Sequence, residues 1–266
     1  MSSVAPIYLI ADLHLDPQRP ETTRLLVDFL DGPARQARAL YILGDLFEAW
    51  IGDDGIGAME RDVAAASARL AEQGVEVRFL CGNRDFLVGD DYCQLARMER
   101  IEEPWHLNHA GTEVLLMHGD ILCTDDVAYQ RFRRKARNPD WQRKVLSYPL
   151  WLRRTLARLA RWRSKRHTGQ TGQQIMDVNA DAVSECFRHH SGVRRIIHGH
   201  THRRAIHDIE VDQRHCQRIV LGDWHEEGSA IRIDENGIAM LTIARDPDGE
   251  IELRLHETAA PLAGNT

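Results

Sequence analysis

The chain has 266 residues, of which 43% are apolar, so it can bury the core of one large α/β domain and is not a disordered protein. Its five cysteines include no Cys-x-x-Cys pair, which argues against a disulfide framework and favours a reduced, cytosolic protein. The first residues lack the basic region of a signal peptide, and no run reaches the roughly 18 apolar residues of a membrane-spanning helix.

The net charge of −6 is distributed unevenly along the chain. Residues 131–166 contain 14 lysines and arginines and a single acid, Asp140, so this basic segment carries +13 and the remainder of the chain carries −19. Such an asymmetry is typical of a segment that meets an anionic partner, for example a membrane surface or a nucleic acid.

Apolar runs and helical periodicity alternate in the first third of the chain. The expected elements are strands at 7–15, 39–47 and 75–85, with helices at 21–30 and 57–73 between them. Gly74 lies where a left-handed cap of the second helix would fall. Alternating strands and helices with short connections predict βαβ units and parallel strand pairing.

The second half of the chain has a different pattern. Residues 105–119 predict a hairpin that turns at Ala110–Gly111, and a helix is expected near 177–190. Strands are expected at 194–198, 205–211, 217–222, 229–234 and 238–244, with a hairpin turn at Glu235–Asn236–Gly237. This half is therefore expected to be antiparallel or mixed.

Five of the apolar runs end in a cluster of Asp, Asn or His. Ligands of open α/β sheets bind outside the carboxyl ends of the strands, so these clusters are expected to meet at one site. A glycine precedes three of them, Gly44, Gly82 and Gly199, and lets the backbone approach closely. The candidate residues are Asp12 and His14, which would project the same way from an extended chain, and then Asp45, Asn83, His118, His200 and His202.

Two carboxylates, one amide oxygen and four imidazoles suit Mn²⁺, Fe or Zn²⁺ rather than a thiolate zinc site. Seven ligands are too many for one small cation, so two ions that share a carboxylate are expected. Two metals roughly 3.5–4 Å apart form a clamp for in-line displacement at phosphorus. Each cluster alone could be ordinary turn chemistry, but all five in order make coincidence the weaker explanation.

The series Asp-x-His, Gly-Asp, Gly-Asn-Arg-Asp, His and Gly-His-x-His, from residue 7 to about residue 224, resembles the calcineurin-like metallophosphoesterases. The resemblance implies an α/β layered sandwich of mixed sheets flanked by helices, with a core at 1–124 and 190–260 and a helical insertion at 125–189. It also implies two divalent ions, with Mn²⁺ as the expected metal. One ion would be held by Asp12, His14, Asp45 and His202 and the other by Asp45, Asn83, His118 and His200, with Asp45 bridging and His198 outside the ligand set.

Three further stretches, LYILGDLFEAWIGDD, MHGDILCTDDVAYQRFRR and IMDVN, resemble one branch of that family. Its members hydrolyse the pyrophosphate bond of UDP-2,3-diacylglucosamine in the lipid A synthesis of Gram-negative bacteria, giving UMP and 2,3-diacylglucosamine 1-phosphate (lipid X). The resemblance implies attack of a metal-activated water at the α-phosphorus, with Asp45, Arg84 and His200 as catalytic residues.

The same resemblance implies which residues contact the substrate. They are Asn83, Arg84, Asp126, Tyr129, Ser164, Thr168, Thr171 and His200. Three positions depart from the pattern, since Thr168 and Thr171 stand where Asn and Lys are expected and His225 stands where an acid is expected. For Arg84 an ion pair with Asp85 is the alternative, and for Asp126 and Tyr129 it is a plain helix N-terminus.

The residues of the basic segment by themselves predict two helices. Asn138 and Pro139 begin one helix, Pro149 interrupts it, and a second helix follows from Leu150. A basic amphipathic helix with Trp is typical of a membrane-surface segment, although the apolar stripe could instead pack on the body of the protein. The stripe consists of Leu152, Leu156, Leu159 and Trp162, and the arginines opposite are Arg153, Arg154, Arg158, Arg161 and Arg163.

These observations predict an enzyme on the cytoplasmic face of the inner membrane. Its expected partners are a lipid-linked UDP sugar and an anionic membrane surface, with no nucleic acid and no obligate protein partner. Two alternatives remain: a metallophosphoesterase for a cyclic nucleotide, dinucleotide or phosphoprotein, and a membrane-surface protein without catalysis. Preference for a soluble phosphodiester would favour the first, and lipid binding without hydrolysis the second.

Overall fold

The computed structural model describes residues 4–170 and 177–262. In the last helix of the basic segment, side chains are described up to Arg161. Seven strands form the first sheet. The strand order is β12-β11-β10-β1-β2-β3-β4. Strands β1 to β4 pair in parallel, as expected, whereas β10, β11 and β12 add antiparallel strands on the other side of β1. Their bounds are β1 Ile7–Ile10, β2 Ala39–Ile42, β3 Glu76–Leu80, β4 Glu99–Ile101, β10 Gly228–Asp234, β11 Gly237–Arg245 and β12 Ile251–Thr258.

The second sheet has five strands in the order β5-β6-β7-β9-β8. Strands β6, β7 and β9 are parallel, and the hairpins β5–β6 and β8–β9 make its two edges antiparallel. The bounds are β5 Trp105–His109, β6 Thr112–Leu116, β7 Arg195–His198, β8 Ala205–Val211 and β9 Arg214–Val220. The hairpin predicted at 105–119 is confirmed, and Ala110 and Gly111 both have positive φ at its turn.

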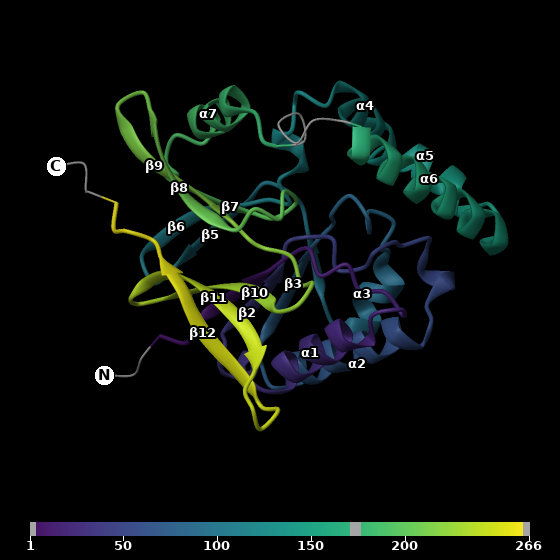
Figure 1. The fold of residues 1–266 in the computed structure, drawn as a ribbon, viewed down its shortest axis with the longest axis horizontal. Coiled ribbons are helices and arrows are strands. Elements are labelled where there is room, and N and C mark those ends of the chain that lie inside the picture. Colours follow the sequence, from purple (N-terminus) through teal and green to yellow (C-terminus); the bar gives the residue numbers. More distant parts are fainter. Residues whose placement is uncertain (1–3, 171–176, 263–266) are drawn as a thin grey trace.

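The two sheets lie face to face, with α1, α2 and α3 on the outside of the first sheet and α7 on the outside of the second (Figure 1). The α/β layered fold class predicted from the sequence is confirmed. The helices are α1 Pro20–Asp31, α2 Ala58–Glu72, α3 Asp90–Ala96, α4 Val127–Ala136, α5 Pro139–Leu146, α6 Leu150–Gln170 and α7 Ala180–His189, with short 3-10 turns η1 Pro33–Gln36, η2 Asp53–Gly55 and η3 Asp120–Leu122.

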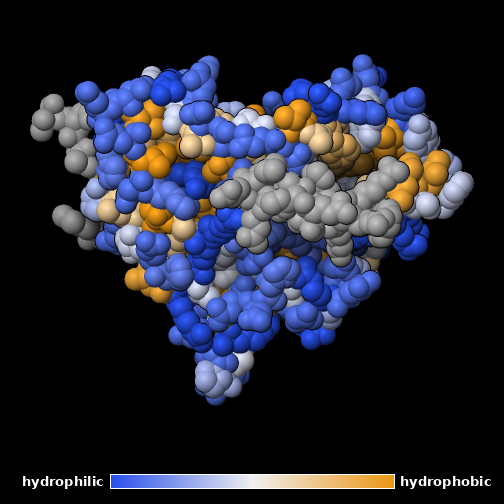
Figure 2. All heavy atoms as spheres, turned by 45° about the horizontal axis from the view of Figure 1, so that its top comes forward, coloured by the Kyte–Doolittle hydropathy of each residue, from blue (hydrophilic) through white to orange (hydrophobic). Residues whose placement is uncertain are grey.

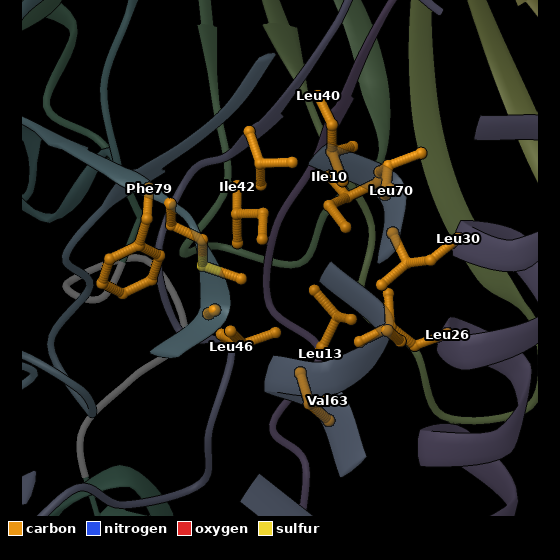
Figure 3. Packing of buried hydrophobic residues seen from close by; sticks show 14 of the residues in the cluster. Ile10, Leu13, Leu26, Leu30, Leu40, Ile42, Leu46, Val63, Leu70 and Phe79 are labelled. Atoms are coloured by element: carbon orange, nitrogen blue, oxygen red, sulfur yellow. The ribbon is translucent and has the colours of Figure 1, made fainter. Parts of the chain in front are cut away.

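Alternation along the central strands builds two cores at once. On β1, Tyr8 and Ile10 pack toward the helices, whereas Ile7 and Leu9 pack between the sheets. Figure 3 shows the helix-side core, in which Ile10 lies among apolar side chains of β2, β3, α1 and α2. Burial on both faces explains why this strand reads as a continuous apolar run.

The strands end earlier than the sequence suggested. β1 stops at Ile10 rather than residue 15, because Asp12 and His14 have left-handed φ values of 57° and 47°. The prediction that these two side chains project from an extended chain is therefore wrong. Three elements were not predicted: α3, β4 and β12, which are short or lie at an edge of the first sheet.

The basic segment forms α4, α5 and α6, which lie together at one end of the molecule (Figure 1). Leu156 and Leu159 are 42% and 46% exposed, so these two residues of the predicted stripe do not pack on the body. Arg153, one of the arginines predicted to lie opposite the stripe, is only 4% exposed and pairs with Asp54 on the body of the protein. No helix among the described residues is long and apolar enough to cross a bilayer.

Candidate metal centre

The predicted ligands are brought together where the two sheets meet at the carboxyl ends of their strands. Asp12, Asp45 and Asn83 follow β1, β2 and β3 of the first sheet. His118 follows β6, and the Gly-His-x-His stretch follows β7, in the second sheet. Parallel strands place their carboxyl ends on one edge, which is why residues as far apart in the sequence as Asp12 and His202 become neighbours.

Asp12, His14 and His202 form one cluster, whose candidate ligand atoms lie within 4.8 Å of one another. The Nε2 atoms of His14 and His202 face each other at 3.1 Å. His202 Nε2 lies 3.6 Å from Asp12 Oδ1. All three residues belong to the set that the resemblance assigns to one metal ion.

Asp12, Asp45 and His118 form a second cluster by the same distance criterion. Asp45 faces both clusters, because its Oδ2 lies 3.8 Å from His14 Nε2 and its Oδ1 lies 3.7 Å from His118 Nε2. Asn83 Oδ1 lies 2.9 Å from both His118 Nε2 and His200 Nδ1. Asp12 belongs to both clusters, and Asp45 lies within 4 Å of an imidazole of each.

The backbone is strained at these residues. Outside glycine, the described residues include nine with positive φ, and five of them are predicted ligands. Left-handed backbone is uncommon for residues with a Cβ and persists where the surrounding structure imposes it. The five are Asp12, His14, Asp45, His200 and His202.

Glycines make room for the two carboxylates. A Cβ on Gly82 would lie 2.1 Å from Asp45 Oδ1, and one on Gly199 would lie 2.2 Å from Asp12 Oδ2. Because no Cβ is present there, the carboxylates can accept nearby backbone N–H groups. The Arg84 N–H donates to Asp45 Oδ1 and the His200 N–H donates to Asp12 Oδ2, each at 2.8 Å. The close approach inferred from the sequence is thus present at both glycines.

Three of the imidazoles have an oxygen of another residue close to their Nδ1 atom. His14 Nδ1 lies 3.3 Å from Glu48, His202 Nδ1 lies 3.2 Å from Asp223, and His118 Nδ1 lies 2.9 Å from the Leu43 carbonyl oxygen. Such contacts fix ring orientation in metal sites and leave Nε2 for the metal. The buried Asp12 Oδ1 has no hydrogen bond among the described residues, so this donor set fits divalent cations.

The pKa values of the histidines in the cluster are shifted in opposite directions. Burial alone would lower the pKa of His118 and of His202, but Asp45 raises the pKa of His118 to about 9, and Asp12 with Asp223 raises that of His202 to about 10. Burial and the neighbouring His118 lower the pKa of His200 to about 4. The carboxylates thus favour the cationic form of two imidazoles, and a metal cation would balance the same negative charge.

Several supporting residues were not predicted. Asp85, inside the Gly-Asn-Arg-Asp stretch, is fully buried and accepts the N–H groups of Leu46 and Gly82, each at 2.7 Å. It therefore ties two ligand loops together and does not pair with Arg84. Its position in the sequence could have indicated this role, because Asp85 directly follows Arg84 in the same Gly-Asn-Arg-Asp motif.

His225, where an acid was expected, also belongs to the surroundings of the site. Its Nε2 lies 3.2 Å from Asp223, the carboxylate that supports His202, and its Nδ1 lies 2.8 Å from Arg19. His198, predicted to lie outside the ligand set, is fully buried with Nε2 3.2 Å from the Arg218 guanidinium. Burial, reinforced by Arg218, lowers the pKa of His198 to about 3.

The predicted substrate contacts divide into three groups. Asp126 is the N-cap of α4, and the Tyr129 ring stacks on the predicted ligand His200 with centroids 6.0 Å apart. Arg84 is half-buried, and its Nε has no hydrogen bond among the described residues. Ser164 and Thr168 lie in the part of α6 whose side chains are not described, and Thr171 lies outside the described residues.

The fold and the donor set define a metal-dependent hydrolase of the phosphoesterase type. The calcineurin-like phosphoesterase model matches residues 5–204, and the chain belongs to that family. The chain is similar to UDP-2,3-diacylglucosamine hydrolases over most of its length. Those of Pseudomonas entomophila (strain L48), Azotobacter vinelandii and Stenotrophomonas maltophilia (strain K279a) are 46%, 48% and 47% identical, over 88%, 86% and 89% of this chain and 97%, 95% and 98% of theirs.

Proposed function

We propose that this enzyme hydrolyses UDP-2,3-diacylglucosamine to UMP and 2,3-diacylglucosamine 1-phosphate, a step of lipid A biosynthesis. The observation that carries the proposal is identity of 46–48% to hydrolases of that substrate over nearly their whole length. The convergence of seven donors at the sheet edge supplies the chemistry. In the reaction a water oxygen bonds to the α-phosphorus, and the bond from that phosphorus to the bridging oxygen breaks.

The metal is proposed to be a pair of Mn²⁺ ions. Asp12, His14, Asp45 and His202 would hold one, and Asp45, Asn83, His118 and His200 would hold the other. Such ions lower the pKa of a water molecule and stabilise negative charge on the phosphates.

Arg84 is proposed to bind an oxygen of the α-phosphate. Its backbone N–H is fixed on Asp45 at 2.8 Å, which holds the residue beside the ligands. Its Nε is buried without a hydrogen bond in the described part of the chain, so a phosphate oxygen would satisfy it. His200, whose ring stacks on Tyr129, or a neighbouring water is proposed to hold the proton of the leaving phosphate.

Residues 125–189 are proposed to be the cap over the lipid part of the substrate, at an anionic membrane surface. Four apolar side chains of α5 and α6 are exposed, and Figure 2 shows apolar residues on the side of the molecule where these helices lie. Arg154 and Arg158 are exposed on the same helix and would favour anionic headgroups. The apolar residues are Leu146, Trp151, Leu156 and Leu159.

The decisive experiment is hydrolysis of UDP-2,3-diacylglucosamine in detergent by protein stripped of metal and then supplied with Mn²⁺. We expect Mn²⁺-dependent release of UMP, which Asp45→Asn abolishes because both proposed ions depend on Asp45. Asp90→Asn, a control with the same charge change at a side chain 92% exposed, should retain full rate. Hydrolysis of bis-p-nitrophenyl phosphate without any UMP release would contradict this substrate and indicate a soluble phosphodiester instead.

Membrane association is tested separately by sedimentation with vesicles that contain anionic phospholipid. Trp151→Ser should reduce the bound fraction, because a 67% exposed indole on α6 would enter the interface. Leu255→Ser, on β12 and 65% exposed, is the control for loss of an exposed apolar side chain elsewhere. Equal vesicle binding by both variants would contradict the proposal that α6 contacts the membrane.

A further inference from the structure

One face of α4 is directed at the metal centre. Tyr129, Arg133 and Arg137 are spaced four residues apart, so they lie along one side of the helix. The Arg137 guanidinium donates to the carbonyl oxygens of Cys81 and Gly82, at 2.8 and 3.0 Å, just before the predicted ligand Asn83. The helix therefore contacts the loop after β3 as well as the residues around His118.

Arg133 lies between two carboxylates from different segments. Its Nε donates to Asp120 Oδ2 at 2.9 Å, and one of its terminal nitrogens pairs with Glu103 Oε1. The side chains of Arg133, Glu103 and Asp120 are 14%, 11% and 0% exposed, so water screens these contacts little. A planar guanidinium can hold both carboxylates at once, which an ammonium group cannot do with the same geometry.

Both carboxylates are connected by hydrogen bonds to predicted metal ligands or to a residue that contacts one. The other oxygen of Glu103 accepts the backbone N–H of His118 at 2.9 Å. Asp120 Oδ2 accepts the Tyr129 hydroxyl at 2.5 Å, and the Tyr129 ring stacks on His200. Arg133 therefore connects through Glu103 to the backbone of one imidazole ligand, and through Asp120 and then Tyr129 to the ring face of another.

We infer that Arg133 is a positioning residue of the metal centre: it fixes Glu103 and Asp120, and through them the orientation of His118 and His200. The seating of α4 and the geometry of the metal ligands then form one coupled unit. Thermodynamic reciprocity requires that metal binding also stabilise α4 in place. This inference rests on the metal centre of the proposed function, but not on the identity of the phosphoester.

The test is Mn²⁺ binding by calorimetry, with no substrate present, to the full chain carrying Arg133→Met. We expect affinity to fall about 10- to 100-fold, as is common for residues that support metal ligands. The control is Arg134→Met, the next residue on the same helix, which is exposed and should stay within about threefold of the parent. Arg133→Lys, which retains the charge but not the fork, should lie between them.

A merely structural role would lower the unfolding temperature of the metal-free protein and leave the Mn²⁺ affinity of its folded fraction unchanged. That result, or equal affinities for Arg133→Met and Arg134→Met, overturns the inference. If Arg133→Met does not fold, Arg133→Lys and hydrogen exchange of the parent decide it, since Mn²⁺ should slow exchange of the α4 amides at 127–136. Failure of UMP release with these affinities as expected would refute the substrate and leave the positioning role standing.

Discussion

Removal of the buried Arg153 should destabilise the attachment of α6 to the body of the protein. The Arg153 side chain, 4% exposed, donates from Nε to the Tyr148 carbonyl oxygen at 2.8 Å and from a terminal nitrogen to Asp54 Oδ1 at 2.8 Å. The second terminal nitrogen pairs with the other oxygen of Asp54, and the carbonyl oxygen of Ile51 accepts a further bond. Arg153→Met retains most of the apolar volume and removes all of these contacts.

The two partners of this ion pair should not be equally important. Asp54 is 59% exposed, so it becomes hydrated when Arg153 is lost, and Arg153→Met should reduce the free energy of unfolding by about 2 kcal/mol. Asp54→Ala leaves the buried guanidinium with only carbonyl partners and should cost about 3 kcal/mol. The adjacent Arg154 is exposed, so Arg154→Met should change the free energy by less than about 0.5 kcal/mol.

Urea unfolding followed by tryptophan fluorescence and circular dichroism measures all three values. A protein of this size loses roughly 2–4 °C of unfolding temperature for each kcal/mol, so Arg153→Met should also melt about 4–8 °C below the parent. Equal urea midpoints for Arg153→Met and Arg154→Met would refute the claim that burial makes this arginine stabilising. A larger loss for Arg153→Met than for Asp54→Ala would refute the argument from unequal exposure.

Three other outcomes are expected. The hydrogen bond from Arg153 lowers the pKa of Asp54 below 3.8, so the pair contributes fully above about pH 4, and the stability gap between the parent and Arg153→Met should narrow as the pH falls below it; a constant gap contradicts this. Gly82→Ala should weaken Mn²⁺ binding at least tenfold, because its Cβ would lie 2.1 Å from Asp45 Oδ1, whereas Gly192→Ala, with open space, should not; equal calorimetric affinities contradict it. Mn²⁺ at about 100 times its Kd should stabilise metal-stripped protein by about 2.7 kcal/mol, read as a melting shift reversed by EDTA; no shift argues against a metal site.

The proposed ligand set could be predicted from the sequence because each of its members is tied to a local pattern. An apolar run followed by Gly-Asp or Gly-Asn marks a strand that ends in a tight turn, as Asp45 and Asn83 show. The parallel order of β1, β2 and β3 follows from alternating strands and helices, and it sends their carboxyl ends to one edge. The chemical class of the protein was therefore predictable before any contact was known.

The conformation of those ligands was not predictable in the same way. Asp12 and His14 look like the continuation of a strand, yet both are left-handed, because hydrogen bonds to Gly44 and Asp45 of the neighbouring loop hold the chain there. Side-chain alternation is a local rule and fails where tertiary contacts bend the backbone.

By itself the sequence determined the family, the order of the proposed metal ligands and the layered α/β fold, since these depend on periodicity and on motifs a few residues long. Only the tertiary structure decided which charged residues are buried. Arg153 meets Asp54 from 99 residues away, and Arg133 meets Glu103 from 30 residues away. Spacing along the chain carries no information about such pairs, because their partners come from segments that meet only when the sheets and helices pack.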